Sequence, residues 1–443
     1  MATHVQAAQV QETVQFPALR WSSGTRVAFR FCFVYFGLYC LATQIITGLV
    51  PLPNVDIPDP ATFWPVRPVI LWVAAHVLRI KAPLVYSETG SGDKTFDWVL
   101  AFCLLIVALC ATAAWSAVDR KRENYVRLHK WFRLFIRFAL AGQLIGYGMS
   151  KAVPLQMPST YLFRLVQPFG SFSPMGVLWS SIGASRGYEI FAGCAEMLGG
   201  VLLIFPRTTM LGALVSLADM TQVFMLNMTY DVPVKLLSFH LILLSLFLLA
   251  PEFPRLANFF LLNRAAGPSM QPELLKTLRA NRIALVMQVV FGAVLIAASA
   301  YQAYSDWYSH GGGSPKSALY GIWSVDQMTI DGQIRSPLVN DYDRWRRVIF
   351  DLPQQIWFQR MDDSFARYGA AIDVGKKSIA MTKRDDKNWK GNFGFDRSGP
   401  EQLALDGEMD GHKVRMELKR VDESKMLLRS RGFHWIQENP FNR

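Results

Sequence analysis

Long apolar runs fill the first two thirds of the chain, and apolar and polar positions alternate in the last third. Between Val27 and Tyr301 the runs are about 18–23 residues long, the length that a helix needs to cross a hydrocarbon core of about 30 Å. After Gly311 they give way to short period-two stretches separated by Asp, Gly, Lys and Asn. The pattern predicts a membrane α-helical bundle followed by a soluble antiparallel β-barrel.

The helical part is expected over residues 27–305, after a polar cytoplasmic N-terminus at residues 1–26. Within residues 68–86 the apolar pattern is interrupted by two basic residues, so we expect an interfacial helix there and not an eighth span. The long loop at residues 154–186 contains four prolines and could be a lid over the bundle or a simple connector. We expect seven spans, at residues 27–49, 97–118, 132–152, 187–205, 208–228, 233–250 and 282–301.

The C-terminal part begins with a glycine-rich linker at residues 306–317. Residues 318–443 follow as eight short alternating stretches with turn residues between them, which is typical of an antiparallel meander closed into a small barrel. We expect the aromatic tail that begins at Ser430 to pack back on this barrel.

Charge and cysteine content narrow the class of protein. Most of the net charge of +12 falls before residue 314, in loops that flank the apolar runs. The positive-inside rule accounts for it, so the lipid bilayer is the expected partner and nucleic acid is not. The distribution predicts a cytoplasmic N-terminus and a C-terminal domain on the opposite side. All five cysteines lie in apolar runs, and no Cys/His spacing predicts a metal site.

Two acidic residues lie deep inside expected spans. Glu196 and Asp219 are each near the middle of a helix, where a charge costs about 2.5–3.5 kcal/mol on insertion scales. Glu196 shares a helix face with Glu189 and two glycines, and Asp219 shares a face with a glycine and a serine. Small residues at this spacing let helices approach closely. We expect the two faces to meet, with Arg137 of the third span as the counter-ion.

This intramembrane cluster has two open interpretations. It could be a buried ion pair that fixes helix register, or a site that handles protons or polarises a ligand, because apolar surroundings raise the pKa of a carboxyl group. Lys151 shares a face with Arg137, and His240 could be a hydrogen-bonded packing residue or a member of the site. Four residues at the outer boundary form a candidate rim, in which the acid and the lysine could also be an ordinary turn-and-cap pair: Asn227, Tyr230, Asp231 and Lys235.

Several phrases between residues 131 and 262 carry a resemblance: GYGMSK at 146–151, QPFGSFSPMG at 167–176, GYEIFAGCAEMLGG at 187–200 and LNMTYDVPVKLLSFH at 226–240. In these the segment resembles the DoxX-like family of bacterial integral membrane proteins. The resemblance implies a four-helix core and a bacterial inner membrane, with the C-terminal domain periplasmic or extracellular. The family's association with thiosulfate:quinone oxidoreduction makes quinone a possible cofactor. The family supplies no catalytic residues, and the extra helices and the C-terminal domain depart from its pattern.

The first expected strand begins with Gly321-Ile322-Trp323. In this the C-terminal domain resembles lipocalin-type barrels, and Arg420 and Arg429 are candidates for the basic residue that packs over the tryptophan. Any small barrel with a core tryptophan explains the tripeptide equally well.

Three functions remain as alternatives. The first is a binding or accessory protein whose barrel takes an apolar small ligand or a periplasmic protein. The second is a quinone-linked membrane oxidoreductase component in which Glu196 and Asp219 carry protons. The third is a small-solute or proton-coupled transporter. No dinucleotide fingerprint, paired cysteines or histidine pair supports a cofactor enzyme.

Overall fold

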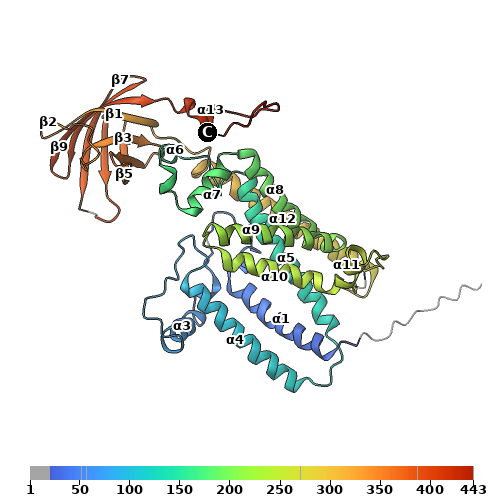
Figure 1. Ribbon diagram of the computed structural model, residues 1–443. Coiled ribbons are helices and arrows are strands. Elements are labelled where there is room, and N and C mark those ends of the chain that lie inside the picture. The colour runs from blue at the N-terminus through green and yellow to red at the C-terminus, as the bar shows by residue number, and fades with distance from the viewer. Residues whose placement is uncertain (1–19, 51, 56, 270, 387, 443) are drawn as a thin grey trace, which may run out of the picture. The chain divides into compact units, whose positions relative to one another are not determined.

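The structure is a computed structural model that describes residues 20–442 apart from 51, 56, 270 and 387, so most of the expected cytoplasmic N-terminus lies outside the described residues. Helices make up the part of the chain before residue 310, and strands follow (Figure 1). The chain divides into two compact units. The helical unit contains residues up to 146 together with 196–227 and 233–298, and the barrel unit contains residues 147–195, 228–232 and those from 299 onward.

Within the described residues, six helical segments are long and apolar enough to cross a membrane, which confirms a membrane-spanning helical part. The third expected span is also a long helix, but its five basic residues make it less apolar than the six. The long helices are α1 (Ser23–Ala42), α4 (Thr95–Val118), α5 (Val126–Ala152), α8 (Arg186–Ile204), α9 (Thr209–Thr229), α10 (Lys235–Leu249) and α12 (Leu278–Ser309). The short ones are α2 (Gln44–Thr47), α3 (Val66–Trp72), α6 (Leu162–Leu165), α7 (Pro174–Gly183), α11 (Phe253–Phe260) and α13 (Leu427–Ser430).

The segment expected to be interfacial forms α3 and a π-helical turn at Val73–Val77. Twelve helical residues rise only about 18 Å, too little to span a bilayer, so this segment is not an eighth span. Ile70 and Ala74 pack against α4, whereas Trp64 and Trp72 are exposed. An apolar outer face rich in tryptophan suits the membrane interface.

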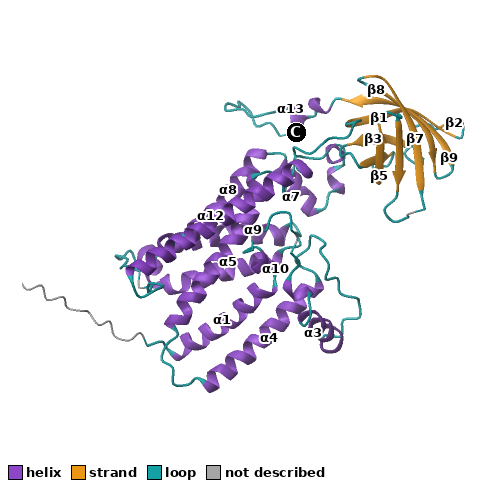
Figure 2. Ribbon diagram, turned by 180° about the vertical axis from the view of Figure 1, so that it is seen from behind, coloured by secondary structure: helices purple, strands orange, loops and turns teal. Residues whose placement is uncertain are grey.

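The barrel closes as an up-and-down meander, which confirms the expected fold class (Figure 2). Neighbouring strands pair antiparallel in chain order, and β9 returns to pair with β1 from Ile322↔Val421 to Ile330↔Val414. The eight strands of the barrel are β1 (Gly321–Ile330), β3 (Trp345–Phe350), β4 (Gln355–Arg360), β5 (Phe365–Asp373), β6 (Ser378–Thr382), β7 (Lys390–Gly399), β8 (Gln402–Met409) and β9 (His412–Val421). A ninth, β2 (Gln333–Ile334), pairs only with the end of β1.

Side chains fill the barrel core. Trp345, Phe358, Tyr368 and Trp389 form a chain of ring contacts with centroid distances of 3.9, 5.5 and 4.9 Å. An eight-stranded barrel is just wide enough for its own side chains to fill it. Aromatic packing of this kind explains why the alternate positions of the strands are apolar.

Trp323 near the start of β1 is fully buried, and its Nε1 donates to the carbonyl of Leu319 at 2.9 Å. Arg420 lies opposite Trp323 in the β1–β9 register. The expectation that Arg420 or Arg429 packs over the ring was wrong. Arg429 instead donates to the carbonyl of Thr160, and the guanidinium over the Trp323 ring is that of Arg397, with Cζ 5.8 Å from the centroid.

The prediction for the C-terminal tail was wrong. Phe433, Trp435 and Ile436 are 76, 91 and 81% exposed, so they do not pack on the barrel. The described residues of the barrel core form an apolar cluster of their own, to which the tail does not contribute.

Candidate functional site

Glu196 and Asp219 lie level with each other on the antiparallel helices α8 and α9. A Cβ on Gly199 would lie 2.9 Å from Ser216 Oγ, and a Cβ on Gly212 would lie 2.9 Å from the backbone nitrogen of Leu203. These contacts fix the register of the helix pair. One turn further from the α8–α9 connection, this register places Glu196 and Asp219 at the same level along the pair. Glu196 is only 2% exposed, and Asp219 is half-buried. The register agrees with the expectation that the two carboxyls are level, and their depth in a membrane stays a prediction.

The face of α8 that was expected to meet α9 packs against α5 instead. A Cβ on Gly200 would lie 3.1 Å from the carbonyl of Ala141, and a Cβ on Gly193 would lie 2.4 Å from the backbone nitrogen of Ala152. The glycine that lets α9 approach is Gly199, one residue along. The glycines of α8 thus serve two neighbours, and the sequence pattern assigned them all to one.

Arg137 is not the counter-ion that was expected. Its Nε and Nη2 donate to the carbonyl of Leu203 at 3.0 and 2.9 Å, Nη2 also donates to Ile204 at 2.7 Å, and Nη1 donates to Gln288 at 3.2 Å. These are the last carbonyls of α8, which have no partner within the helix. A cation at a helix C-terminus is also favoured by the helix dipole. Arg137 therefore caps α8.

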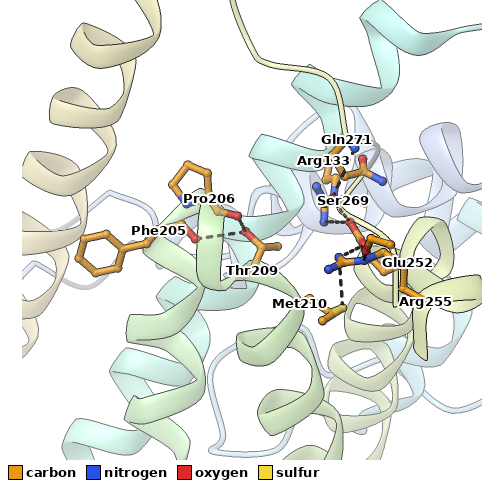
Figure 3. A network of polar contacts seen from close by, with 10 residues as sticks. Arg133, Phe205, Pro206, Thr209, Met210, Glu252, Arg255, Ser269 and Gln271 are labelled. Atoms are coloured by element: carbon orange, nitrogen blue, oxygen red, sulfur yellow. Dashed lines mark hydrogen bonds and ion pairs between the residues drawn. The ribbon is translucent and has the colours of Figure 1, made fainter. Parts of the chain in front are cut away.

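Glu252, which the sequence pattern did not mark, lies beside Arg133 of the basic face of α5. Glu252 is buried, and its Oε2 accepts from Arg255 at 2.5 Å while Oε1 accepts from Ser269 at 2.7 Å (Figure 3). Arg133 lies 4.0 Å from Oε1. One signal in the sequence could have pointed to Glu252: it comes directly after Ala250-Pro251, at the end of an apolar run.

His240 sits in an aromatic setting on α10. Its Nδ1 is 2.7 Å from the carbonyl of Leu236 and its Nε2 is 2.9 Å from Tyr35 Oη, while its ring stacks on Tyr39 at 3.6 Å. A carbonyl only accepts, so Nδ1 carries the proton and Nε2 accepts from the Tyr35 hydroxyl when the ring is neutral. Both ring nitrogens are thus occupied, which fits the packing interpretation.

Glu189 and Lys151 are both buried in the barrel unit. Glu189 Oε1 accepts from the backbone N–H of Met157 at 2.9 Å, and Lys151 Nζ lies 5.9 Å from the centre of the Tyr147 ring. Glu189 therefore fixes the start of the loop that follows α5. The shared site with Glu196 that the stripe predicted stays a prediction.

The candidate rim divides between two roles. Lys235 begins α10, and its backbone N–H and that of Leu236 donate to the carboxylate of Asp93 at 2.8 Å each, with Lys235 Nζ 3.8 Å away. Asp93, which sequence reasoning missed, thus caps this helix. Asn227 donates to Ser238 Oγ at 3.0 Å. Tyr230 is half-buried, and Asp231 is exposed with a φ of 53°.

The loop at residues 154–186, for which lid and connector were both open, docks on the outer wall of the barrel. Leu162 of α6 is fully buried against Ile322 of β1 and Ile349 of β3. Its backbone N–H donates to Asp351 Oδ2 at 2.7 Å, and buried Gln359 donates to the carbonyl of Val166 at 3.1 Å. Two hydrogen bonds and a small apolar cluster therefore attach the loop to the strands.

A pocket of about 500 Å³ lies between this loop and the barrel wall. Its apolar walls include Phe163 and Trp357, whose rings stack at 4.3 Å, together with Trp179 and Met175. The polar residues that line it are Thr160, Tyr161, Arg164, Ser173, Ser180, Asp351, Gln355 and Arg367. The volume is in the range of small-molecule sites, and the lining combines aromatic walls with many polar groups.

The charges in this pocket are distributed unevenly. Burial raises the pKa of Asp351, while the Leu162 N–H and the charges of Arg429 and Lys316 act to lower it. Burial lowers the pKa of Arg164, whose guanidinium lies 5.0 Å from the ring centres of both Phe163 and Phe172. Arg367 lies over Trp357 at 5.6 Å.

The described residues contain no group of three or more His, Cys, Asp or Glu side chains placed to hold a metal ion. The pocket's donors, two guanidinium groups, a tyrosine and hydroxyls, suit an organic ligand better than a metal.

Comparison with known proteins gives one relative and no function. No family model and no solved structure match the chain. Over 127 residues, 27% of its length, the chain is 31% identical to the uncharacterized protein YwoB of Bacillus subtilis (strain 168) and covers 72% of it. The chain belongs to the family of YwoB. YwoB is itself described as uncharacterized, so the similarity gives no function, and the function has to be inferred from the site.

Proposed function

We propose that the protein is a membrane-anchored binding protein, in which spanning helices hold a barrel whose outer-wall pocket takes an apolar or amphipathic ligand. The observation that carries the proposal is the pocket of about 500 Å³ between α6–α7 and strands β4 and β5. Buried aliphatic and aromatic side chains occupy the barrel core, and this pocket lies on the outer wall.

The proposed membrane and the orientation of the protein in it are based on the sequence patterns. The resemblance to the DoxX-like family supports a bacterial inner membrane, and the distribution of basic residues supports a cytoplasmic N-terminus with the barrel on the periplasmic or extracellular side. The Gly321-x-Trp323 start with Arg420 beside it supports a lipocalin-type barrel.

Photo-crosslinking tests the pocket. The full-length protein in lipid nanodiscs is labelled with a diazirine analogue of a long-chain alcohol, and the modified peptides are mapped by mass spectrometry. Ser180 lines the pocket and its neighbour Ser181 does not, so Ser180→Trp blocks the pocket and Ser181→Trp is the matched control. We expect label on residues of α6, α7 and β4 in the wild type and the control, and its loss in Ser180→Trp. Equal labelling in both variants contradicts the proposal.

The level placement of Glu196 and Asp219 favours a second candidate, a quinone-linked component in which the two carboxyls exchange protons. This candidate needs a quinone site near α8 and α9. The Glu196→Gln substitution distinguishes this candidate from a packing role, because a lost response to quinone at an unchanged melting temperature would support proton transfer.

A further inference from the structure

We propose that the outer-wall pocket selects amphiphiles with one anionic group, a carboxylate or a phosphate, joined to an apolar body. This inference rests on the proposed function and names its ligand class. The pocket brings two guanidinium groups, those of Arg164 and Arg367, to the same aromatic-walled space.

Neither of these arginines is paired with a carboxylate among the described residues. Arg164 donates to the amide oxygen of Gln167 at 2.7 Å, and Arg367 lies over the Trp357 ring. The one acid in the lining, Asp351, accepts from Leu162 and is balanced by Arg429 and Lys316. The pocket thus carries an excess of positive charge.

The aromatic rings hold the two guanidinium groups in place without using their donors. Arg164 lies between Phe163 and Phe172, each 5.0 Å from its Cζ, and a guanidinium has five N–H donors, of which Gln167 takes one. The remaining N–H donors of Arg164 are left for an anion, and bidentate binding of carboxylate or phosphate is the geometry that arginine favours over lysine. An anion also offsets the cost of burying Arg164.

The remaining walls define the rest of the ligand. Phe163 and Trp357 stack on each other, and Trp179 and Met175 extend the apolar surface. The hydroxyl oxygen of Thr160, which is buried and makes no hydrogen bond to the described residues, adds a polar group at the same pocket. Such a combination suits an apolar chain or ring that ends in an acid, and excludes a free inorganic anion as the preferred ligand.

The test compares dodecanoate with dodecanol, which differ only in the head group. Binding to the full-length protein in phosphatidylcholine nanodiscs is measured by competition with the diazirine probe. We expect dodecanoate to bind about tenfold or more tightly than dodecanol, since hydrogen bonds to charged groups contribute more than neutral ones. Arg164→Gln/Arg367→Gln should remove this preference, so that dodecanoate and dodecanol bind this variant with equal affinity. Arg164→Lys/Arg367→Lys should keep part of it. The matched control is Arg415→Gln, an exposed barrel arginine that does not line the pocket.

Added phosphatidylglycerol distinguishes two sources of the anion. If phosphatidylglycerol competes with the probe, the site binds a membrane lipid head group. If it does not compete, the site binds a free amphiphile. Equal affinity for dodecanoate and dodecanol, or a preference that survives in the double glutamine variant, overturns the inference. Such a result leaves the proposed function standing as long as Ser180→Trp abolishes binding of both compounds. If Ser180→Trp has no effect, the proposed function fails as well.

Discussion

Replacing Asp351 is expected to release α6 from the barrel wall. Asp351 Oδ2 accepts the backbone N–H of Leu162 at 2.7 Å, and Leu162 is fully buried with Ile322 and Ile349. In Asp351→Ala the amide of fully buried Leu162 loses its acceptor, which costs about 1–3 kcal/mol. Asp351→Asn keeps an oxygen that can accept, so its cost should be smaller.

Hydrogen exchange measures this cost directly. A destabilisation of about 1–3 kcal/mol corresponds to a 5- to 150-fold increase in the open population of α6. The rate is followed by mass spectrometry on the peptide that contains Leu162, in the full-length protein in nanodiscs. Asp396→Ala, which removes an exposed barrel acid bound to Lys377, is the control and should leave the rate unchanged. Exchange in Asp351→Ala within about twofold of the wild type would refute the reasoning, as would equal exchange in the Ala and Asn variants.

The same contact should depend on pH with a definite sign. Burial raises the pKa of Asp351 above its ordinary value of 3.8, and this effect outweighs the Leu162 N–H and the neighbouring cations. When α6 is docked, Asp351 therefore keeps its proton at pH values at which it has lost the proton in the undocked state. Docking is strongest below the ordinary value and weakens as the pH rises through the raised pKa. In Asp351→Asn this dependence should disappear.

Two other predictions address the helices and the barrel. Glu196→Gln should lower the melting temperature in detergent, with a loss of up to about 3–5 kcal/mol if the carboxylate belongs to a buried charge pair. An unchanged melting temperature together with a lost response to added quinone would instead support the proton-transfer candidate. A fragment of residues 315–443 should give a β-type circular dichroism spectrum, because its strands close on themselves through the β1–β9 pairing. A helical or random-coil spectrum would show that the barrel needs the rest of the chain.

The barrel could be predicted because its signals are local. Alternation marks the inward face of each strand, and Asp331-Gly332 and Asp410-Gly411 have the two positive φ angles that tight hairpins require. All eight expected strands are present. The strand that was missed, β2, is two residues long and gives no alternation to detect.

The pocket could not be predicted from such local patterns. Its walls join Phe163 to Trp357, residues far apart in the chain, and the contact between them depends on a long loop docking on a finished barrel. One signal was available: Trp357 and Phe365 stand on strands at positions between core residues, so their side chains face outward. Outward-facing aromatic residues on a soluble barrel indicate a surface that something else covers.

In the membrane part, helical geometry predicted which residues of α8 and α9 are level, but not which neighbouring helix each face contacts. The short turn between α8 and α9 fixes which residues are level, so Glu196 and Asp219 could be matched from the sequence. Each of these helices is apolar on most of its surface, and hydropathy therefore does not say which face meets which neighbour. The glycines of α8 were accordingly assigned to the wrong partner in part.

Arg137 shows why a charge-matching argument fails inside a bundle. Charge matching considers only acidic side chains as partners. The strongest acceptors near a helix end are backbone carbonyls, which every residue possesses and no sequence pattern reveals. By binding Leu203 and Ile204, Arg137 holds the end of α8 where the chain turns into α9. That turn determines the register of the two helices, and the register sets Glu196 level with Asp219. Arg137 thus positions the backbone that carries both carboxyls.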